Sequence, residues 1–250
     1  MDHPGFNMGR VVENRHWNKT LYSLRVEAKI KAFKAGQFAK LALPADDELV
    51  ARPYSLVNPP ADSILEFYSI VIPEGPLSPR LADLAVGDAV WVSQSASGFL
   101  ILDEVPEGRD LWLLATGTGI GPFLSIIRTE QAWKRFEKII LVHAVRHKDE
   151  LTYSETISAV RAQHDGRLVV VPFVSREKIK GTLDGRIPQA IDNGLLEERT
   201  GSAIDPQHSQ VMLCGNPAMV KETTALLCEQ RGLSRNRRRT PGHITIENYW

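Results

Sequence analysis

The chain has 250 residues, of which 43% are hydrophobic and 24% are charged, as expected of a soluble globular protein. Its formal net charge of zero does not indicate a polyanionic partner, and no apolar run approaches the roughly 18 residues that a membrane span needs. Cys214 and Cys228 are too few for a disulfide scaffold, a four-cysteine zinc site or a cysteine-ligated iron–sulfur cluster. We therefore expect a reducing, cytoplasmic setting and one large domain or two of ordinary size.

The first part of the chain is expected to form short strands. Residues 9–102 contain apolar runs with a period of two, at 21–26, 37–43, 64–72 and 89–92. Turn residues separate these runs, so the pattern predicts a small sandwich or barrel. One short helix is expected at 78–84, with Ser78 as its cap and Pro79 at its first position. Residues 1–10 lack the apolar core of a secretory signal and are expected to be a loose lead-in.

The pattern changes at about Asp110, where the apolar runs become continuous, as in strands buried on both faces. Strands are expected at 111–115, 139–142, 168–173 and 211–213. Helices are expected from about residue 123, at 150–163 and at 217–231. This alternation predicts a parallel sheet that is covered by helices on both sides. A polar linker near 103–110 separates the two patterns and suggests domains at 1–104 and 109–250.

Residues 52–55, with the sequence Arg-Pro-Tyr-Ser, place a cation, an aromatic ring and a hydroxyl on one expected strand. Pro53 cannot donate to a strand ladder, which favours an edge strand or a bend. Alternation along a strand would put Arg52 and Tyr54 on one face and Ser55 on the other, unless the strand bends. A ligand with both a phosphate and a flat ring would suit this stretch. An ordinary edge strand could carry the same residues.

Two turns between a strand and a helix are suited to anions, because backbone amides at a helix start lack internal partners. One is the glycine loop at 116–122, whose spacing matches neither the dinucleotide fingerprint nor a P-loop. The other is the turn at 74–80, where Ser78 adds a hydroxyl donor. The alternatives are a glycine turn without a ligand and a simple capped helix.

Arginines follow the expected strands of the second half, at Arg146, Arg176 and Arg186. Ligands of open parallel sheets bind outside the carboxyl ends of the strands, where arginine can form a bidentate contact with phosphate. Each arginine alone would also fit a solvated surface. No histidine, cysteine or carboxylate spacing indicates a metal site or a catalytic triad.

The C-terminal region combines a basic cluster with two terminal aromatic residues. The basic cluster would suit an acidic docking partner or a solvated surface, and consists of Arg235, Arg237, Arg238 and Arg239. Tyr249 and Trp250 end the chain, so their rings either pack into the core or stack on a flat ligand.

In this order and spacing, the motifs resemble those of the bacterial ferredoxin/flavodoxin–NADP⁺ reductases, from about residue 9 to residue 250. The resemblance is carried by residues 52–55, 67–71, 75–81, 115–122, 174–176, 212–217 and 249–250. It implies two domains, an antiparallel six-stranded FAD-binding β-barrel and then an α/β parallel-sheet NADP-binding domain whose aromatic tail returns to the FAD. Pro53 departs from the alanine that is common in close relatives.

The resemblance implies roles for the residues around FAD. Arg52 would contact the FAD phosphates, while Tyr54 would stack on the isoalloxazine and Ser55 would hydrogen-bond near flavin N5. Tyr249 would cover the other flavin face, and Trp250 would stack on the adenine. This makes Tyr54, Ser55 and Tyr249 the implied catalytic group. The remaining implied FAD contacts are Pro53, Tyr68, Ser69, Ile70, Val71, Pro76, Leu77, Ser78 and Thr118, of which residues 76–78 would hold the pyrophosphate.

For NADP, the resemblance implies a binding set at the ends of the strands of the second half. It consists of Val145, Arg146, Ser175, Arg176, Arg186, Asn216 and Pro217, with the arginines on the 2′-phosphate and adenine side. Thr118 would lie where the nicotinamide meets the flavin. Plant-type members of the family have a glutamate that helps proton transfer near flavin N5, and Glu247 is a candidate for it.

The implied reaction is hydride transfer from NADPH to flavin N5, followed by single-electron transfer to an acidic ferredoxin or flavodoxin. Tyr249 would have to move before the nicotinamide could stack on the flavin. The alternatives are a reductase on the same scaffold for an oxygenase or a ferric complex, and a non-catalytic flavoprotein. We expect a cytoplasmic monomer without a metal, a nucleic-acid partner or a membrane partner.

Overall fold

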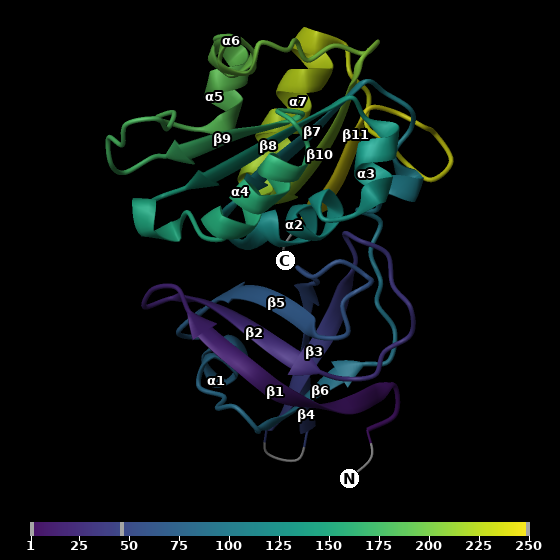
Figure 1. Ribbon diagram of the computed structural model, residues 1–250, viewed down its shortest axis with the longest axis vertical. Helices are drawn as coiled ribbons and strands as arrows, with labels where there is room; N and C mark the ends of the chain where they lie inside the picture. Colours follow the sequence, from purple (N-terminus) through teal and green to yellow (C-terminus); the bar gives the residue numbers. More distant parts are fainter. Residues whose placement is uncertain (1–2, 46–47, 249–250) are drawn as a thin grey trace.

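The N-terminal half is a six-stranded antiparallel sheet in the computed structural model, which describes residues 3–45 and 48–248 (Figure 1). Its strands are β1 (Phe6–His16), β2 (Leu21–Glu27), β3 (Phe38–Ala45), β4 (Glu48–Ser55), β5 (Leu65–Ile70) and β6 (Ala89–Ser93). They pair in the order β4-β3-β6-β1-β2-β5. A bridge between Leu56 and Phe67 brings the chain after β4 back to β5 and closes the sheet into a barrel. The predicted antiparallel barrel is confirmed.

The barrel core follows from the period-two pattern. Leu41 and Leu43 of β3 pack inside with Val90 and Val92 of β6. Burial of such side chains stabilises the fold by about 1.5–3 kcal/mol each. The helix α1 (Ser78–Ala82) closes one side of this core through Leu81 and the residue before the helix.

Two details of the barrel differ from the predictions. The loose lead-in is wrong, because residues 6–10 already pair with β6, a partner about 80 residues away that local sequence does not indicate. Ser78 is not the helix cap, because Leu77 occupies that position. The Ser78 hydroxyl instead accepts a 2.9 Å hydrogen bond from the backbone N–H of Ile72.

The second half is a five-stranded sheet whose neighbouring strands are all parallel, in the order β11-β10-β7-β8-β9. The strands are β7 (Asp110–Thr116), β8 (Lys138–Val145), β9 (Leu168–Val174), β10 (Ser209–Gly215) and β11 (Ile244–Asn248). Helices α2 (Gly121–Ile127), α3 (Glu130–Arg135) and α4 (Ser154–Gln163) pack on one face. The other face is covered by α5 (Ile187–Asp192), α6 (Leu195–Thr200) and α7 (Pro217–Arg231). The predicted α/β fold is confirmed.

The central strand β7 shows why this half reads as continuous apolar runs. Leu111 and Leu113 pack with α2 and α3, whereas Trp112 and Leu114 pack with α5 to α7 on the opposite face. All four side chains are fully buried, so period-two alternation disappears from the sequence.

The helix predictions were accurate for α7 and less accurate elsewhere. The helix expected at 150–163 begins only at Ser154, because residues 148–150 form the separate 3₁₀ turn η3 (Lys148–Glu150) and Tyr153 has a left-handed backbone. The short helices α3, α5 and α6 and the fifth strand β11 were not predicted. Among the described residues, no helix is long and apolar enough to cross a membrane.

The two halves share one hydrophobic cluster. Leu21, Val57 and Tyr68 of the N-terminal half pack in the same cluster as Phe123 and Tyr153 of the second half. The carboxyl ends of the parallel strands point toward the barrel (Figure 1). The ends of several strands and the barrel surface therefore meet along one boundary.

Candidate active site

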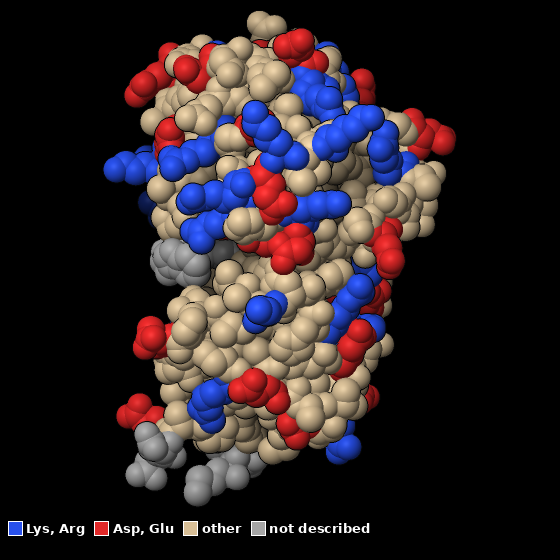
Figure 2. All heavy atoms as spheres, turned by 90° about the vertical axis from the view of Figure 1, so that its left-hand side faces the viewer, with Lys and Arg blue, Asp and Glu red and all other residues tan. Residues whose placement is uncertain are grey.

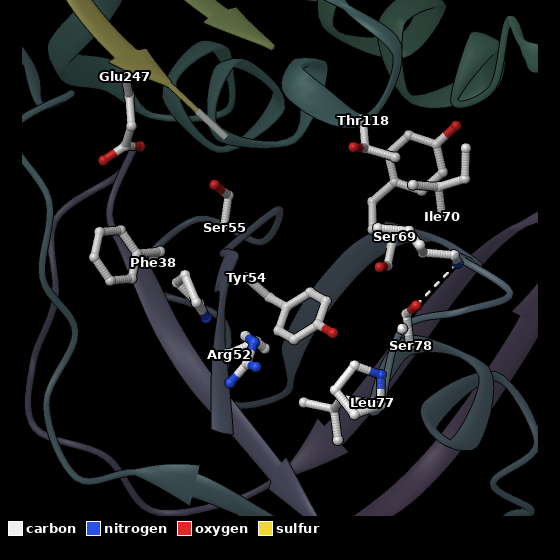
Figure 3. Close-up of a pocket in the computed structure, with 15 residues that line it drawn as sticks. Phe38, Arg52, Tyr54, Ser55, Ser69, Ile70, Leu77, Ser78, Thr118 and Glu247 are labelled. Carbon is white, nitrogen blue, oxygen red and sulfur yellow. Dashed lines mark hydrogen bonds between the residues drawn. The ribbon is translucent and has the colours of Figure 1, made fainter. Parts of the chain in front are cut away.

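A cleft of about 580 Å³ lies at this boundary (Figure 3). Its size is within the range of small-molecule and cofactor sites. Most of its lining comes from the barrel, and Thr118 and Glu247 come from the second half. The lining residues are Phe38, Arg52, Pro53, Tyr54, Ser55, Tyr68, Ser69, Ile70, Ile72, Gly75, Pro76, Leu77, Ser78, Thr118 and Glu247.

The end of β4 forms one wall of the cleft. β4 stands at one end of the strand order, and Pro53 faces Lys40 of β3, so the ring of Pro53 disturbs only one ladder. Arg52 is exposed, and Tyr54 is half-buried, which raises the pKa of its hydroxyl to about 12. Ser55 is buried and also lines the cleft, because the chain turns there toward the Leu56 bridge. The bend thus brings cation, ring and hydroxyl to one cavity.

The opposite wall is the end of β5 and the turn before α1. Gly75 suits this turn, because a Cβ there would make a tight 3.0 Å contact with the carbonyl oxygen of Ile72. Tyr22 donates from its hydroxyl to the backbone oxygen of Ser78 at 3.1 Å, which fixes the start of the helix. Ile70 and Ile72 are 38% and 42% exposed, so they offer apolar surface to a ligand. Ser69 and residues 76–78 also face the cleft.

Val71 differs from its neighbours. It does not line this cleft and packs partly against the barrel core, because alternation along the strand turns it away. Its role toward a ligand stays a prediction.

Thr118 reaches the cleft from the 3₁₀ turn η2 (Gly117–Ile120), which follows β7. The turn lies directly on the end of β10, since a Cβ on Gly119 would be 2.5 Å from the Cys214 carbonyl oxygen. Gly117 has a φ of +52°, and its carbonyl lies 3.1 Å from Nε2 of the buried His143. Burial lowers the pKa of His143 to about 4, so the neutral ring donates to this carbonyl.

Glu247 projects into the cleft from β11, on the side away from Arg52 (Figure 3). Burial raises the pKa of its carboxyl to about 7. Its Oε2 atom is buried and has no hydrogen-bond partner among the described residues. A Cβ on Gly98 would lie 3.1 Å from Glu247 Oε1, so the glycine leaves room for the carboxyl. A carboxyl in this state can hold or release a proton near neutral pH.

Arg146 and Arg176 closely follow the carboxyl ends of β8 and β9, and Arg186 is the N-cap residue of α5. Ser175 and Arg176 donate from their backbone N–H groups to the carbonyls of Val145 and Arg146, at 3.1 and 2.9 Å, so these segments are adjacent. Arg146, Arg176 and Arg186 are exposed, and none forms an ion pair with a described residue. Figure 2 shows Lys and Arg side chains gathered on this side of the second half. This edge is suited to a phosphate ligand.

Asn216 and Pro217 begin α7 at the end of β10. The Asn216 side-chain oxygen caps the helix by accepting from Ala218 N at 2.9 Å. Its backbone N–H donates to the Thr116 hydroxyl at 2.8 Å, which ties the ends of β7 and β10 together. In the strand order, these two residues lie beside the turn that carries Thr118, on the side of β7 opposite to β8 and β9.

Comparisons with known proteins agree with this geometry. The family described as an oxidoreductase NAD-binding domain matches residues 113–225. The flavodoxin/ferredoxin–NADP reductase of Escherichia coli K12 is 47% identical over 242 residues, which cover 97% of this chain and 98% of that protein. The ferredoxin–NADP reductase of Pseudomonas aeruginosa is 38% identical over 248 residues, or 95% of each chain. This chain belongs to the flavodoxin/ferredoxin–NADP reductase family.

A solved structure of this reductase family supports the same conclusion. The ferredoxin NADP⁺ reductase from Neisseria gonorrhoeae, with bound FAD and NADP, has a TM-score of 0.93 and 31% identity. The similarity covers 99% of this chain and all of that chain. The family resemblance read from the sequence is thus confirmed. The roles of the individual site residues stay predictions.

Some cleft residues of this reductase were not predicted from the sequence. Phe38 and Ile72 look like ordinary strand residues, and only the barrel closure turns them toward the cleft. Glu247 was a candidate only, and its burial and raised pKa are the signals that set it apart. Tyr249 and Trp250 lie outside the described residues, so the expected sandwich of a ring between Tyr54 and Tyr249 stays a prediction.

Proposed function

We propose that this chain is a FAD-dependent reductase that passes electrons between NADPH and a one-electron carrier, a ferredoxin or a flavodoxin. The observation that carries the proposal is the meeting of residues 52–55 and Thr118 in one cleft between the barrel and the α/β sheet. Residues 1–104 would form the FAD-binding domain and residues 109–250 the NADP-binding domain. Electrons would cross between the two cofactors at Thr118.

The lining of the cleft fits FAD. It combines one cation, Arg52, with several hydroxyls and with apolar walls at Phe38, Ile70 and Ile72. Arg52 would neutralise a phosphate, and the Gly75 turn allows the backbone N–H groups of Leu77 and Ser78 to approach the pyrophosphate, with Pro76 beside it. A bound FAD supplies what no side chain can, which is acceptance of two electrons and their release one at a time.

Side chains near the reacting atoms would orient the flavin and handle protons. Tyr54 would lie against the flavin ring, and the Ser55 hydroxyl would hydrogen-bond at its reacting edge. Glu247 would hold a proton at its carboxyl near neutral pH, since burial has raised its pKa to about 7. Tyr249 would exclude water from the other face until NADPH binds.

NADPH would bind along the carboxyl ends of the second sheet. Arg146, Arg176 and Arg186 would hold the 2′-phosphate and adenine side, together with Ser175 and Val145. Asn216 and Pro217 would flank the same cofactor. This arrangement favours NADPH over NADH, because only NADPH carries the phosphate that neutralises the arginines.

The carrier would dock at Arg235, Arg237, Arg238 and Arg239, which are all exposed. Arg237 and Thr240 exchange two backbone hydrogen bonds of 3.0 Å, so the segment forms a turn. Asn236 anchors the turn, because its buried amide donates to the Glu104 carbonyl at 2.6 Å and to the Thr245 hydroxyl at 2.9 Å. Arginines on an anchored turn would steer an acidic carrier. We also infer a cytoplasmic location, which the low cysteine content favours, and we favour a monomer.

The direct test is anaerobic mixing of the purified protein with NADPH. The visible flavin band should bleach, and two equivalents of oxidised flavodoxin or ferredoxin, each taking one electron, should restore it. A yellow protein that NADPH cannot bleach would be a non-catalytic flavoprotein, and a colourless protein would contradict FAD binding. Reoxidation by a ferric complex but by neither carrier would identify a reductase for another acceptor.

A further inference from the structure

Tyr153 is an unusual residue of the second half. Its backbone has φ +58° and ψ +22°, a left-handed conformation that is costly for an aromatic residue. Its side chain is only 6% exposed. Asp165 is the only other non-glycine residue with a positive φ in the described parts of the chain. The strained backbone directs this side chain away from its own sheet.

The Tyr153 side chain crosses to the barrel. Its hydroxyl donates to Glu66 Oε1 of β5 at 2.7 Å and lies 2.5 Å from the Ser23 hydroxyl of β2. Trp17 donates from its indole N–H to the same Ser23 oxygen at 2.7 Å. The donors therefore run in one direction, from Trp17 to Ser23 to Tyr153, and end on the Glu66 carboxylate. Burial holds the pKa of Tyr153 well above its usual value, which keeps the hydroxyl protonated as a donor.

The Tyr153 ring also touches the wall of the cleft. It meets Tyr68 edge-on, with ring centroids 5.2 Å apart, and leans on Trp17 at 4.8 Å. Tyr68 lies directly opposite Ser23 in the β2–β5 ladder and lines the cleft proposed for FAD. The Tyr153 side chain of the second half therefore contacts two neighbouring barrel strands, β2 and β5, beside the cleft.

The same segment is connected to the edge proposed for NADPH. Arg146 follows β8, and its backbone N–H donates to Glu150 Oε2 at 3.1 Å. Three residues later the chain reaches Tyr153. A shift of this segment on the barrel would thus change the distance between Arg146 and the cleft wall at Tyr68.

We propose that Tyr153 is a positioning residue that sets the NADPH-binding edge at the correct distance from the flavin wall. The inference rests on the proposed function, because it assigns the two ends of this distance to two cofactors. Separate contacts on the α2 side, such as Ser125 with Asn58 and Arg128 with Asp62, hold the halves together without Tyr153. Loss of the Tyr153 contacts should therefore loosen one edge of the boundary while the protein remains folded.

Three variants test this role. Tyr153→Phe keeps the ring and removes the hydroxyl. From the barrel side, Glu66→Ala removes the acceptor of this hydroxyl and Ser23→Ala removes its donor. Thr200→Val is the matched control, because it removes a buried hydroxyl that donates to the Leu196 carbonyl at 3.0 Å. Thr200 belongs to α6, far from the barrel (Figure 1).

The first measurement is backbone hydrogen exchange of the FAD-loaded protein without NADPH. We expect exchange in β2 and β5 to become about five- to tenfold faster in Tyr153→Phe, as loss of one hydrogen bond implies. The barrel-side variants should behave alike, and Thr200→Val should leave these strands unchanged. Unchanged exchange in both Tyr153→Phe and Glu66→Ala would overturn the proposal.

The second measurement separates positioning from binding. In Tyr153→Phe, the rate of flavin reduction at saturating NADPH should fall about five- to tenfold. The dissociation constant of 2′,5′-ADP, which reaches only the arginine end, should not change. Equal losses in both quantities, or a wild-type reduction rate, would contradict the positioning role. A wild-type protein that NADPH cannot reduce would instead contradict the proposed function.

Discussion

Ser125 of α2 donates from its hydroxyl to the backbone carbonyl of Asn58 at 2.7 Å, across the boundary between the two halves. Both residues are fully buried. Asn58 follows the cleft residue Ser55 by three positions, and Ser125 follows Thr118 by seven positions. This one bond therefore links the flavin-side strand to the turn that carries Thr118.

Replacement of Ser125 with alanine should weaken both stability and flavin reduction. The variant leaves a buried carbonyl without its partner, which costs about 1–3 kcal/mol of unfolding free energy. Ser209→Ala is the control, because Ser209 is also buried and donates to the Ala203 carbonyl, but this bond lies within the second half and does not cross the boundary. Urea unfolding should show losses in both variants, whereas NADPH-dependent bleaching should slow only in Ser125→Ala. Equal bleaching rates would contradict the link.

The fold could be predicted where packing leaves a local pattern. Leu111 to Leu114 form a continuous apolar run because successive side chains fill two different cores, and that run predicted β7 well. The strand at Phe6 was missed because its pairing partner is distant in sequence. The late start of α4 was also missed, because the left-handed Tyr153 is held by barrel residues that a helix pattern does not include.

Arg176→Ala should discriminate between the two nicotinamide cofactors. A charge-assisted contact to phosphate contributes about 1.5–3 kcal/mol, so the KM for NADPH should rise roughly 10- to 150-fold. The KM for NADH should stay nearly constant, because NADH lacks the 2′-phosphate. Arg161→Ala removes an exposed arginine from α4 and serves as the control. Similar losses with NADPH and NADH would argue against the assigned role.

Glu247→Gln should stabilise the protein increasingly as pH rises above about 4.5, up to about pH 7. The pKa of Glu247 is about 7 in the folded protein, against an ordinary value of 4.5, so the unfolded chain releases this proton first. Wild-type stability is therefore lost as pH rises from about 4.5 to 7, by at most about 3 kcal/mol. At pH 4 the carboxyl is largely protonated in both the folded and the unfolded state, so the stability difference between variant and wild type there measures mainly the packing effect of the substitution. A difference that stays constant from pH 4 to pH 8 would refute the raised pKa.

The sequence predicted the side-chain chemistry of the site better than the set of residues that surround the cleft. Residues 52–55 and Ser78 carry the chemistry that a phosphate and a flat ring need, and they do line one cleft. Phe38 and Ile72 have no such chemistry, so only the closed barrel reveals them. Alternation along β4 suggested that Ser55 would face away, and the turn toward Leu56 corrects this.

His143 should make the folded protein sensitive to acid. Burial lowers its pKa from 6.5 to about 4, so the unfolded chain binds this proton first as pH falls. The stability from the neutral ring is complete above pH 6.5 and is lost between about pH 6.5 and 4, by at most about 3 kcal/mol. In His143→Gln the acid-induced loss should be smaller, measured by urea unfolding at several pH values. The difference in unfolding free energy between variant and wild type at pH 7.5 measures the packing effect of the substitution. If the two proteins lose stability in parallel below that pH, the lowered pKa of His143 is contradicted.

The arginine turn should control how fast an acidic carrier is reduced. In Arg237→Ala/Arg239→Ala, Arg238 stays in place over the Phe99 ring, so the turn keeps one anchor. At low salt the rate of flavodoxin reduction should fall by about tenfold, because charge steering depends on these side chains. At 0.5 M salt the carrier-reduction rates of the variant and the wild type should converge, because salt at this concentration screens charges beyond a few ångströms.

Arg161→Ala/Lys221→Ala is the control, because it removes the same charge from exposed helix positions and should change the rate little. The rate with a neutral quinone should be equal in all three proteins, and a salt-independent loss in the turn variant would rule out electrostatic docking.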